Sequence, residues 1–368
     1  MGRKANLINF IVSMAITMGT LLAVVAICNN RYSEDMVMAV VKISVGAIVA
    51  GFINTLAHEL GHYFVGKKNG FAFSAITIWF LRWQKVKNKV KFSFCMFGDE
   101  AGYTEMIPTS TENVGEKFKK MASAGYKVSF VLMLIGIPAL FIKALPVWVF
   151  CIWAMFLPIG AYFFFGSFLP ASNEGFLNDG AVVKGIKNGD DTSKVTINLL
   201  AIQAQLYNGK TPAEVDEDLY FNLPQLPEDD VNFIMLLNAR YLYYLDKGDY
   251  ENAKKVTDRL VGLAEDMPKA LIAPVMVDAL YNACTFDYNE KLADEITEDY
   301  EKYLNSVNTA NTVRAKLAYL LYVRNEKDVF EVFYKKGVKE AKKCQIKGLT
   351  ALELKLFDLM KSDFEKNA

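Results

Sequence analysis

Histidine is almost absent from this chain, because its 368 residues include only His58 and His62. A surplus of charge is absent too, since 41 basic and 41 acidic side chains cancel, and this balance gives no support for nucleic acid as a partner. No Cys-x-x-Cys pair occurs among the five cysteines, which are Cys28, Cys95, Cys151, Cys284 and Cys344. The spacing therefore indicates neither a disulfide framework nor a cysteine zinc site. It is typical of isolated thiols, in keeping with a reducing compartment for the C-terminal half.

Long apolar stretches are what the sequence has instead, and four of them precede residue 170, at 7–28, 36–63, 128–145 and 147–169. A helix that crosses a bilayer needs about 20 mostly apolar residues. Three of the stretches meet this length easily, whereas 128–145 is marginal because Pro138 and Lys143 interrupt it. No cleavage site is clear after the first stretch, so we interpret it as a retained helix rather than a signal peptide. The sequence predicts four membrane spans.

The distribution of lysine and arginine predicts the orientation of these spans. Basic residues are concentrated before the first stretch, between residues 67 and 127, and in the C-terminal half, whereas the two short intervening links carry only Arg31 and Lys143. Basic loops are retained on the cytoplasmic side of a membrane. We therefore expect a multi-pass protein of the cell membrane with both termini in the cytoplasm.

Residues 72–97, between the second and third stretches, alternate apolar and polar side chains on both sides of a polar turn near Asn88. This pattern predicts a β-hairpin. Its many aromatic residues suit a position at the membrane interface, but a small cytoplasmic sheet has the same composition, and the sequence leaves both open.

The C-terminal half is polar and helical in pattern, which divides the chain into a membrane domain, 1–185, and a soluble domain, 186–368. Thr211 and Pro212 form a helix-start signal. Turn signals at 248–250, 286–288 and 325–327 separate helical runs at intervals of just under 40 residues. This loose repeat over about 230–345 resembles tetratricopeptide-like arrays, which present a concave surface for a protein partner. A helical bundle without a ligand is the alternative. The predicted fold class is mostly α: a polytopic membrane helical domain of four spans, with the β-hairpin between spans two and three, followed by a soluble, repeat-like helical domain.

Both histidines lie in one helical turn, in the stretch "LAHELGHYFVG" at the end of the second apolar run. The pattern His-Glu-x-x-His on a helix places two imidazoles on one face, where both can reach a single zinc ion. Glu59 stands beside His58 in the place of the general base. Ionisable residues inside a membrane helix are costly and usually functional. We therefore predict that His58 and His62 bind Zn²⁺ and that Glu59 is catalytic.

Two histidines leave the metal one protein ligand short, and no third histidine exists. Asp179 lies just past the fourth apolar stretch, on the same predicted side of the membrane as His58. Glu174, Asp99 and Glu100 are the alternatives. We favour Asp179, because a turn or a helix end accounts for the other three carboxylates. Asn54, one turn before His58, is a candidate for substrate binding, with an interhelical hydrogen bond as the simpler explanation.

Three segments carry a resemblance to the site-2 protease family of intramembrane zinc metalloproteases: "HELGH", "ASAGYKVSF" (122–130) and "SFLPASNEGFLNDG" (167–180). The resemblance implies that His58, His62 and Asp179 bind zinc and that Glu59 is the catalytic glutamate. Tyr126 replaces a usual proline, Ser167 a usual asparagine, and Asn178 interrupts a usual Leu-Asp-Gly. The longer spacing before Asp179 is similar to that of Gram-positive members, which implies a bacterial protein.

The resemblance implies a zinc metalloendopeptidase of regulated intramembrane proteolysis, which hydrolyses a peptide bond in or near the membrane span of a protein or peptide. It further implies that residues 72–97 pair with the substrate as an added strand. The alternative function is a membrane-tethered adaptor in which the helical repeats bind a partner and the zinc site is structural. A structural site has no need of Glu59, so the sequence favours the protease.

Overall fold

The computed structural model describes residues 3–33, 35–87, 89–96, 101–173 and 175–367. The chain divides into two compact units. The first unit comprises Met1–Lys85, Val90–Ile107 and Asn113–Asp190, and the second comprises Val86–Lys89, Pro108–Glu112 and Asp191–Ala368. Among the described residues, helices dominate both units, in agreement with the predicted fold class.

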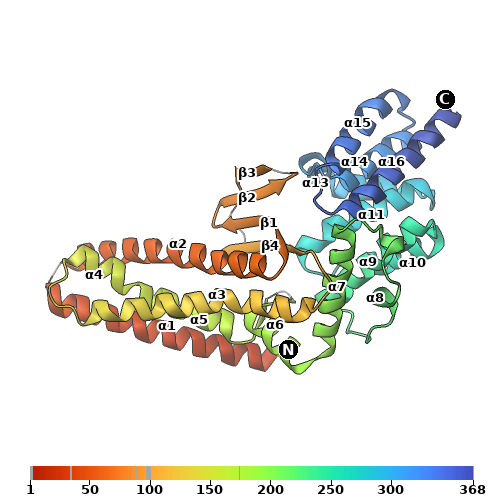
Figure 1. The fold of residues 1–368 in the computed structure, drawn as a ribbon. Coiled ribbons are helices and arrows are strands. Elements are labelled where there is room, and N and C mark those ends of the chain that lie inside the picture. The colour runs from red at the N-terminus through yellow and green to blue at the C-terminus, as the bar shows by residue number, and fades with distance from the viewer. Residues whose placement is uncertain (1–2, 34, 88, 97–100, 174, 368) are drawn as a thin grey trace. The chain divides into compact units, whose positions relative to one another are not determined.

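Long apolar helices make up most of the first unit and run side by side (Figure 1). The elements are α1 (Arg3–Tyr32), α2 (Met36–Lys68), α3 (Val114–Gly136), the 3-10 turn η1 (Ile137–Leu140), α4 (Val147–Ala154), α5 (Phe156–Phe168) and α6 (Asp179–Asn188). Within the described residues, four segments are long and apolar enough to cross a membrane: Asn6–Tyr32, Met36–Lys68, Val114–Leu140 and Val147–Phe168. The four predicted spans are therefore confirmed in number by length and composition.

Two of the spans differ in detail from the prediction. The third helix begins at Val114 rather than near residue 128, because its first three turns are amphipathic and carry charges that hide them from a hydropathy pattern. The fourth span consists of α4 and α5 with a break at Met155. The break lies three residues before Pro158, which has no backbone N–H to donate.

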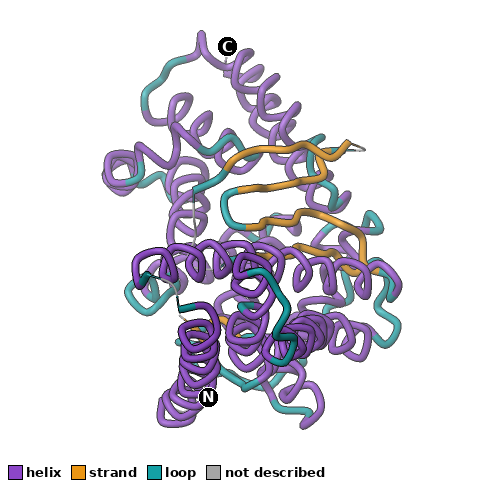
Figure 2. The backbone as a smooth tube through the Cα atoms, turned by 90° about the vertical axis from the view of Figure 1, so that its left-hand side faces the viewer, coloured by secondary structure: helices purple, strands orange, loops and turns teal. Residues whose placement is uncertain are grey.

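The predicted hairpin is part of a four-stranded sheet with the order β3-β2-β1-β4. The strands of this sheet are labelled in Figure 1 and drawn in orange in Figure 2. Its strands are β1 (Phe71–Ile78), β2 (Leu81–Val86), β3 (Lys89–Phe94) and β4 (Gly102–Pro108). β1 and β2 are antiparallel, with Ala75 opposite Gln84 and Ile78 opposite Leu81. A second, two-stranded sheet joins β5 (Ser172–Asn173) and β6 (Phe176–Leu177), just before α6. β4 is thus an edge strand that the sequence did not predict.

The start of α2 and the packing of α3 determine where the two histidines lie in the first unit. Asp35 caps the start of α2, where its carboxylate accepts hydrogen bonds from the backbone N–H groups of Val37 and Met38. α2 then continues without a break for 33 residues to Lys68, so His58 and His62 lie in a regular stretch of helix. α3 packs against α2, α5 and α6. The helix that carries the histidines and the helix that begins with Asp179 therefore share one neighbour, α3.

The second unit is built from short helices joined by tight turns. They are α7 (Asp191–Tyr207), η2 (Pro212–Glu214), α8 (Asp218–Phe221), α9 (Val231–Lys247), α10 (Tyr250–Gly262), α11 (Lys269–Thr285), α12 (Glu290–Asp299), α13 (Glu301–Ser306), α14 (Ala310–Ala318), the π-helical turn η3 (Tyr319–Val323), η4 (Lys327–Val329), α15 (Phe330–Ala341) and α16 (Lys347–Asn367). Each of the three predicted turn signals lies at a junction between helical elements, with Gly248, Tyr288 and Asn325 in left-handed backbone conformation. The tetratricopeptide-like repeat itself stays a prediction.

Candidate active site

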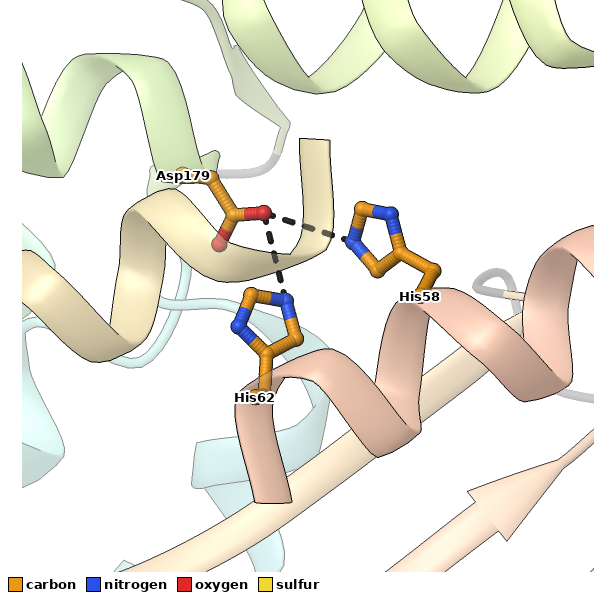
Figure 3. Close-up of side chains that lie close together, drawn as sticks. All are labelled: His58, His62 and Asp179. Carbon is orange, nitrogen blue, oxygen red and sulfur yellow. Dashed lines mark ion pairs between the residues drawn. The ribbon is translucent and has the colours of Figure 1, made fainter. Parts of the chain in front are cut away.

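Helix α2 presents His58 and His62 on one face, one turn apart, and both imidazoles point towards Asp179 (Figure 3). Nε2 of each ring lies 3.3 Å from the same carboxylate oxygen, Oδ2 of Asp179. Both histidines are buried, at 7% and 8% exposure. Residues more than a hundred positions apart in the sequence therefore meet in one small polar cluster, as the candidate ligand set requires.

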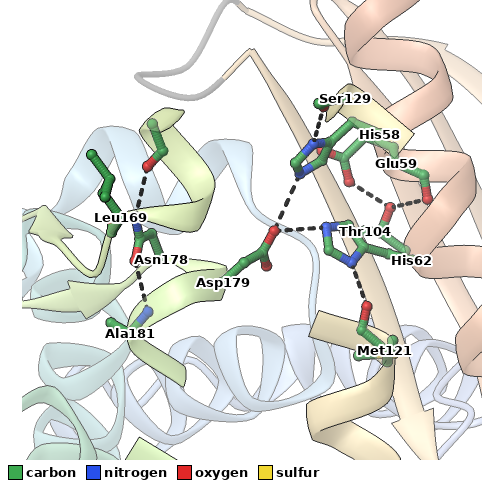
Figure 4. Close-up of polar contacts among 11 residues, drawn as sticks. His58, Glu59, His62, Thr104, Met121, Ser129, Leu169, Asn178, Asp179 and Ala181 are labelled. Carbon is green, nitrogen blue, oxygen red and sulfur yellow. Dashed lines mark hydrogen bonds and ion pairs between the residues drawn. The ribbon is translucent and has the colours of Figure 1, made fainter. Parts of the chain in front are cut away.

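Asn178 holds the backbone from which Asp179 projects (Figure 4). Its side-chain oxygen accepts hydrogen bonds from the backbone N–H groups of Ala171 and Ala181, each at 3.0 Å. Its side-chain amide donates to the carbonyl oxygens of Gly166 and Leu169, at 2.7 and 2.8 Å. Asn178 is thus the N-cap of α6 and also ties this helix to the end of α5. The residue that interrupts the expected Leu-Asp-Gly order has a positioning role of its own.

The outer nitrogen of each imidazole has its own partner. Nδ1 of His62 donates to the carbonyl oxygen of Met121 at 2.9 Å, because a carbonyl can only accept. Nδ1 of His58 lies 3.0 Å from the hydroxyl of Ser129, which is fully buried. Such contacts fix the orientation and tautomer of metal-binding histidines. With its proton on Nδ1, the neutral ring of His62 turns the lone pair of Nε2 towards the carboxylate oxygen of Asp179.

Electron-pair donors that face one another at 3.3 Å repel, unless a cation stabilises them. A tetrahedral zinc ion with ligand bonds of ~2.0–2.1 Å holds its ligand atoms ~3.3 Å apart. The observed separations between Nε2 and Oδ2 are 3.3 Å for both histidines. All three candidate ligand atoms lie within 4.8 Å of one another. The donor set and its spacing therefore fit zinc.

Glycines let the backbone approach this cluster closely. A Cβ atom on Gly125 of α3 would lie 2.4 Å from Nε2 of both His58 and His62. A Cβ atom on Gly180 would lie 2.1 Å from the carbonyl oxygen of Phe168. A side chain at position 125 would displace both imidazoles, and one at position 180 would collide with the backbone at the end of α5. Gly125 thus leaves room for the cluster, and Gly180 allows α6 to start directly against the end of α5.

Glu59 lies beside the ligand cluster and is held by strand β4. The hydroxyl of Thr104 donates to Oε2 of Glu59 at 2.6 Å. Gly102 lies against the other oxygen, since a Cβ atom there would approach Oε1 to 2.7 Å. Glu59 is only 6% exposed. The carboxylate is therefore fixed between α2 and the edge strand of the sheet.

Asp179 lies outside the four membrane segments, and its electrostatic surroundings favour the ionised form. Burial raises the pKa of this carboxyl, but His58 and His62 in their protonated form, which supplies the positive charge that a bound metal ion would otherwise supply, lower it more, so the net pKa is below its ordinary value. An ionised carboxylate is the form that can bind a metal.

Other residues singled out in the sequence have different surroundings. Asn54 is fully buried, and its side-chain amide donates to the carbonyl of Ala50 in its own helix at 2.9 Å. This placement gives Asn54 no exposed surface for a substrate. Tyr126 packs its ring against Phe168. The alternative ligands Glu174, Asp99 and Glu100 lie outside the described residues.

Several contacts of the site were not predicted from the sequence. Thr104, Ser129 and the carbonyl of Met121 all contact the motif from elements that are distant in the chain. Ser129 and Gly125 lie in the segment 122–130, which carried part of the family resemblance but gave no signal for these contacts. Thr104 had no signal at all.

The fold and the site together define a class: a multi-pass membrane protein with a metallopeptidase-type cluster of two histidines, an aspartate and an adjacent glutamate. Comparison with protein families identifies the family within this class. Residues 46–344 match the model of Peptidase family M50, and the chain belongs to this family of membrane metallopeptidases, the site-2 protease family. Its members are generally zinc metalloproteases. No curated protein and no solved structure matched the chain. The match continues well past Asp179 into the second unit, beyond the segments that carry the resemblance in the sequence.

Proposed function

We propose that this chain is an intramembrane zinc metalloprotease that hydrolyses a peptide bond in or near the membrane span of a protein or peptide. The convergence of His58, His62 and Asp179 beside Glu59 carries this proposal. His58, His62 and Asp179 would hold the zinc ion. Bound in such a site, zinc acts as a Lewis acid, which polarises a carbonyl group and makes water more acidic.

Glu59 would move the proton. One carboxylate oxygen, Oε2, already accepts the hydrogen bond from Thr104, which leaves Oε1 to accept a proton from the attacking water. Oε1 would then return this proton to the leaving amine, so that Glu59 acts first as general base and then as general acid. Thr104 is a positioning residue for this step, because it restricts the rotation of the carboxylate.

The substrate would bind as an extended strand, because a helix keeps its carbonyl groups in its own hydrogen bonds. The sequence suggested residues 72–97 as the pairing segment. Strand β4 is a more direct candidate, since it is an edge of the sheet and carries Thr104 next to Glu59. A peptide added at an exposed edge gains main-chain hydrogen bonds without any change in the sheet. The exposed rings of Phe92 and Phe94 on β3 support a position of this sheet at the membrane interface.

The basic segments around residues 67–127 support an orientation with both termini in the cytoplasm. In this orientation the zinc site lies near the cytoplasmic face, where water is available. Asp179, which follows the last membrane segment, supports the same placement.

A comparison of membrane peptides from cells that contain the wild-type protein or Glu59→Gln tests the proposed function. Glutamine preserves the size of the side chain and can still accept the hydrogen bond from Thr104, but it cannot take up a proton. We expect one or more membrane-derived fragments to disappear in the variant and their uncleaved precursors to accumulate. Identical peptide sets from the two strains would overturn the assignment of Glu59.

The second candidate function is the membrane-tethered adaptor, in which the helical unit binds a partner and the zinc site is structural. The buried, hydrogen-bonded position of Glu59 beside the ligands supports the protease instead. Both functions can coexist in one chain, and a pocket in the second unit supports a binding role there.

A further inference from the structure

A pocket of about 280 Å³ opens between helices α11 to α15 of the second unit. Its apolar lining includes Leu280, Leu304, Leu320 and Phe333. This volume lies just below the usual range of about 300–1,000 Å³ for ligand sites, which suits one compact apolar group rather than a large cofactor.

The wall of this pocket contains an irregular helical turn. Tyr319 and Leu320 line the pocket and belong to the π-helical turn η3, which follows α14 directly. Turns of this type are rare and are frequently found at functional sites. The hydroxyl of Tyr319 donates to Asp294 of α12 at 2.8 Å, which ties this wall to α12.

One cation, Lys316, lines the pocket beside the apolar groups. Its ammonium lies 6.0 Å from the centre of the Phe333 ring and donates to the side-chain oxygen of Asn305 at 2.8 Å. No carboxylate of the described residues lies within 4.0 Å of this ammonium, although most lysines of the second unit with a close polar partner have an acidic one.

Two features of its surroundings destabilise the charged form of Lys316. Partial burial lowers the pKa of Lys316, and the neighbouring positive charge of Lys336 lowers it further. Glu301 also lines the pocket but is itself exposed and has no ion pair with Lys316. An anion that entered the pocket would relieve the repulsion between the two lysines.

We propose that this pocket binds a carboxylate carried on a compact apolar group, such as the C-terminal residue of a peptide, with the carboxylate on Lys316 and the apolar group against Leu280, Leu304 and Phe333. The inference does not depend on the proposed proteolytic activity. It assigns the second unit a ligand of defined chemistry. A free aromatic acid offers the same chemistry as a peptide terminus, and the test below separates the two sources.

Binding can be measured by calorimetry on the purified full-length Glu59→Gln protein in detergent, so that the probes are not cleaved. The probes are the peptide N-acetyl-Gly-Gly-Ala-Phe with a free carboxylate, the same peptide as its C-terminal amide, and 3-phenylpropionate. We expect the acid peptide to bind at least about tenfold more tightly than the amide, which is the effect of a charge-assisted contact. Binding of 3-phenylpropionate as tightly as the peptide supports the site with a small acid as ligand, and weaker binding supports it with a peptide terminus.

Two further substitutions link this binding to the pocket. Lys316→Met keeps the aliphatic stem over Phe333, and we expect it to remove the tenfold preference for the acid. Thr297→Met adds a larger side chain to the lining of the pocket and should weaken the binding of both peptides. The matched control is Lys335→Met, which removes an exposed lysine that pairs with Glu331 on the surface of α15. Equal affinity of the parent protein for acid and amide, a preference for the acid that persists in Lys316→Met, or unchanged affinity for both peptides in Thr297→Met would overturn the proposal.

Discussion

The two units of this protein bury ionisable groups in opposite ways. In the first unit, two imidazole nitrogens and a carboxylate oxygen face one another, and all three are electron-pair donors. In the second unit, the fully buried guanidinium of Arg314 contacts Glu353 at 2.9 Å and lies 3.8 Å from Asp278. The central guanidinium carbon of Arg314 lies 3.9 Å from the centre of the Tyr281 ring. The second cluster contains its own cation, which is typical of a structural network, whereas the first has the composition of a metal site.

Gly125→Ala tests the metal site of the first unit and has the largest expected effect. The new methyl group would lie 2.4 Å from both ligand nitrogens. We expect zinc affinity to fall by at least about a hundredfold and proteolysis to be lost with it. Zinc content of the purified variant is the measurement. Gly166→Ala is the matched control, because a Cβ atom there has no neighbour within 4 Å and should leave zinc content unchanged.

Arg314→Met tests whether the buried ionic cluster of the second unit is structural. This change leaves Glu353 and Asp278 buried without their cation, and removal of one partner from a buried ion pair costs about 3–5 kcal/mol. We expect a loss of stability of that order in urea unfolding, with zinc content per folded chain unchanged. A normal unfolding midpoint would show that the cluster is not structural.

Asp278→Asn tests how the buried cluster of the second unit makes stability depend on pH. Burial raises the pKa of Asp278 from 3.8 to about 7, although Arg314 lowers it in part. Between these two values the folded state binds more protons than the unfolded state, so this group's contribution to stability falls as pH rises through that window. Asparagine mimics the neutral acid and removes this dependence. We expect the variant to match the wild type near pH 4 and to exceed it at pH 8 by at most on the order of 4 kcal/mol. Unfolding curves at the two pH values test this, and parallel pH profiles for both proteins would contradict it.

Thr104→Val has the smallest expected effect and separates positioning from metal binding. It removes the hydrogen bond to Glu59, and a hydrogen bond to a charged group contributes about 1.5–3 kcal/mol. We expect kcat to fall at least about tenfold on a substrate found by the peptide comparison, with KM and zinc content little changed. Thr104→Ser keeps the hydroxyl and should restore most of the activity. A larger effect on zinc than on kcat would assign Thr104 a different role.

The sequence predicted those parts of the molecule that depend on local pattern. His58, Glu59 and His62 share one helical turn, so their common face follows from helix geometry alone. The four spans follow from composition. Asp179 was the favoured carboxylate because of its place after the last apolar stretch, and the structure places it against both histidines.

Features that depend on distant contacts or unusual backbone were not predictable in this way. Trp79 adopts a left-handed conformation in the turn between β1 and β2 without any glycine or asparagine to signal it, so one hairpin was expected where three strands exist. Thr104 contacts Glu59 across 45 residues. The sulfurs of Cys28 and Cys151 lie 3.8 Å apart, although the two residues are scattered in the sequence. Arg314 had no sequence signal that distinguished it from a surface arginine.

The most direct test of the central claim is the zinc stoichiometry of the purified protein and of three variants. We predict about one zinc ion per chain for the wild type and for Glu59→Gln, because this glutamate is not a ligand. We predict a large loss of zinc for His62→Ala and for Asp179→Ala, since each removes one of the three candidate ligands. Full retention of zinc in Asp179→Ala would contradict the account, because the contact between Asp179 and the two histidines would then not be a metal site.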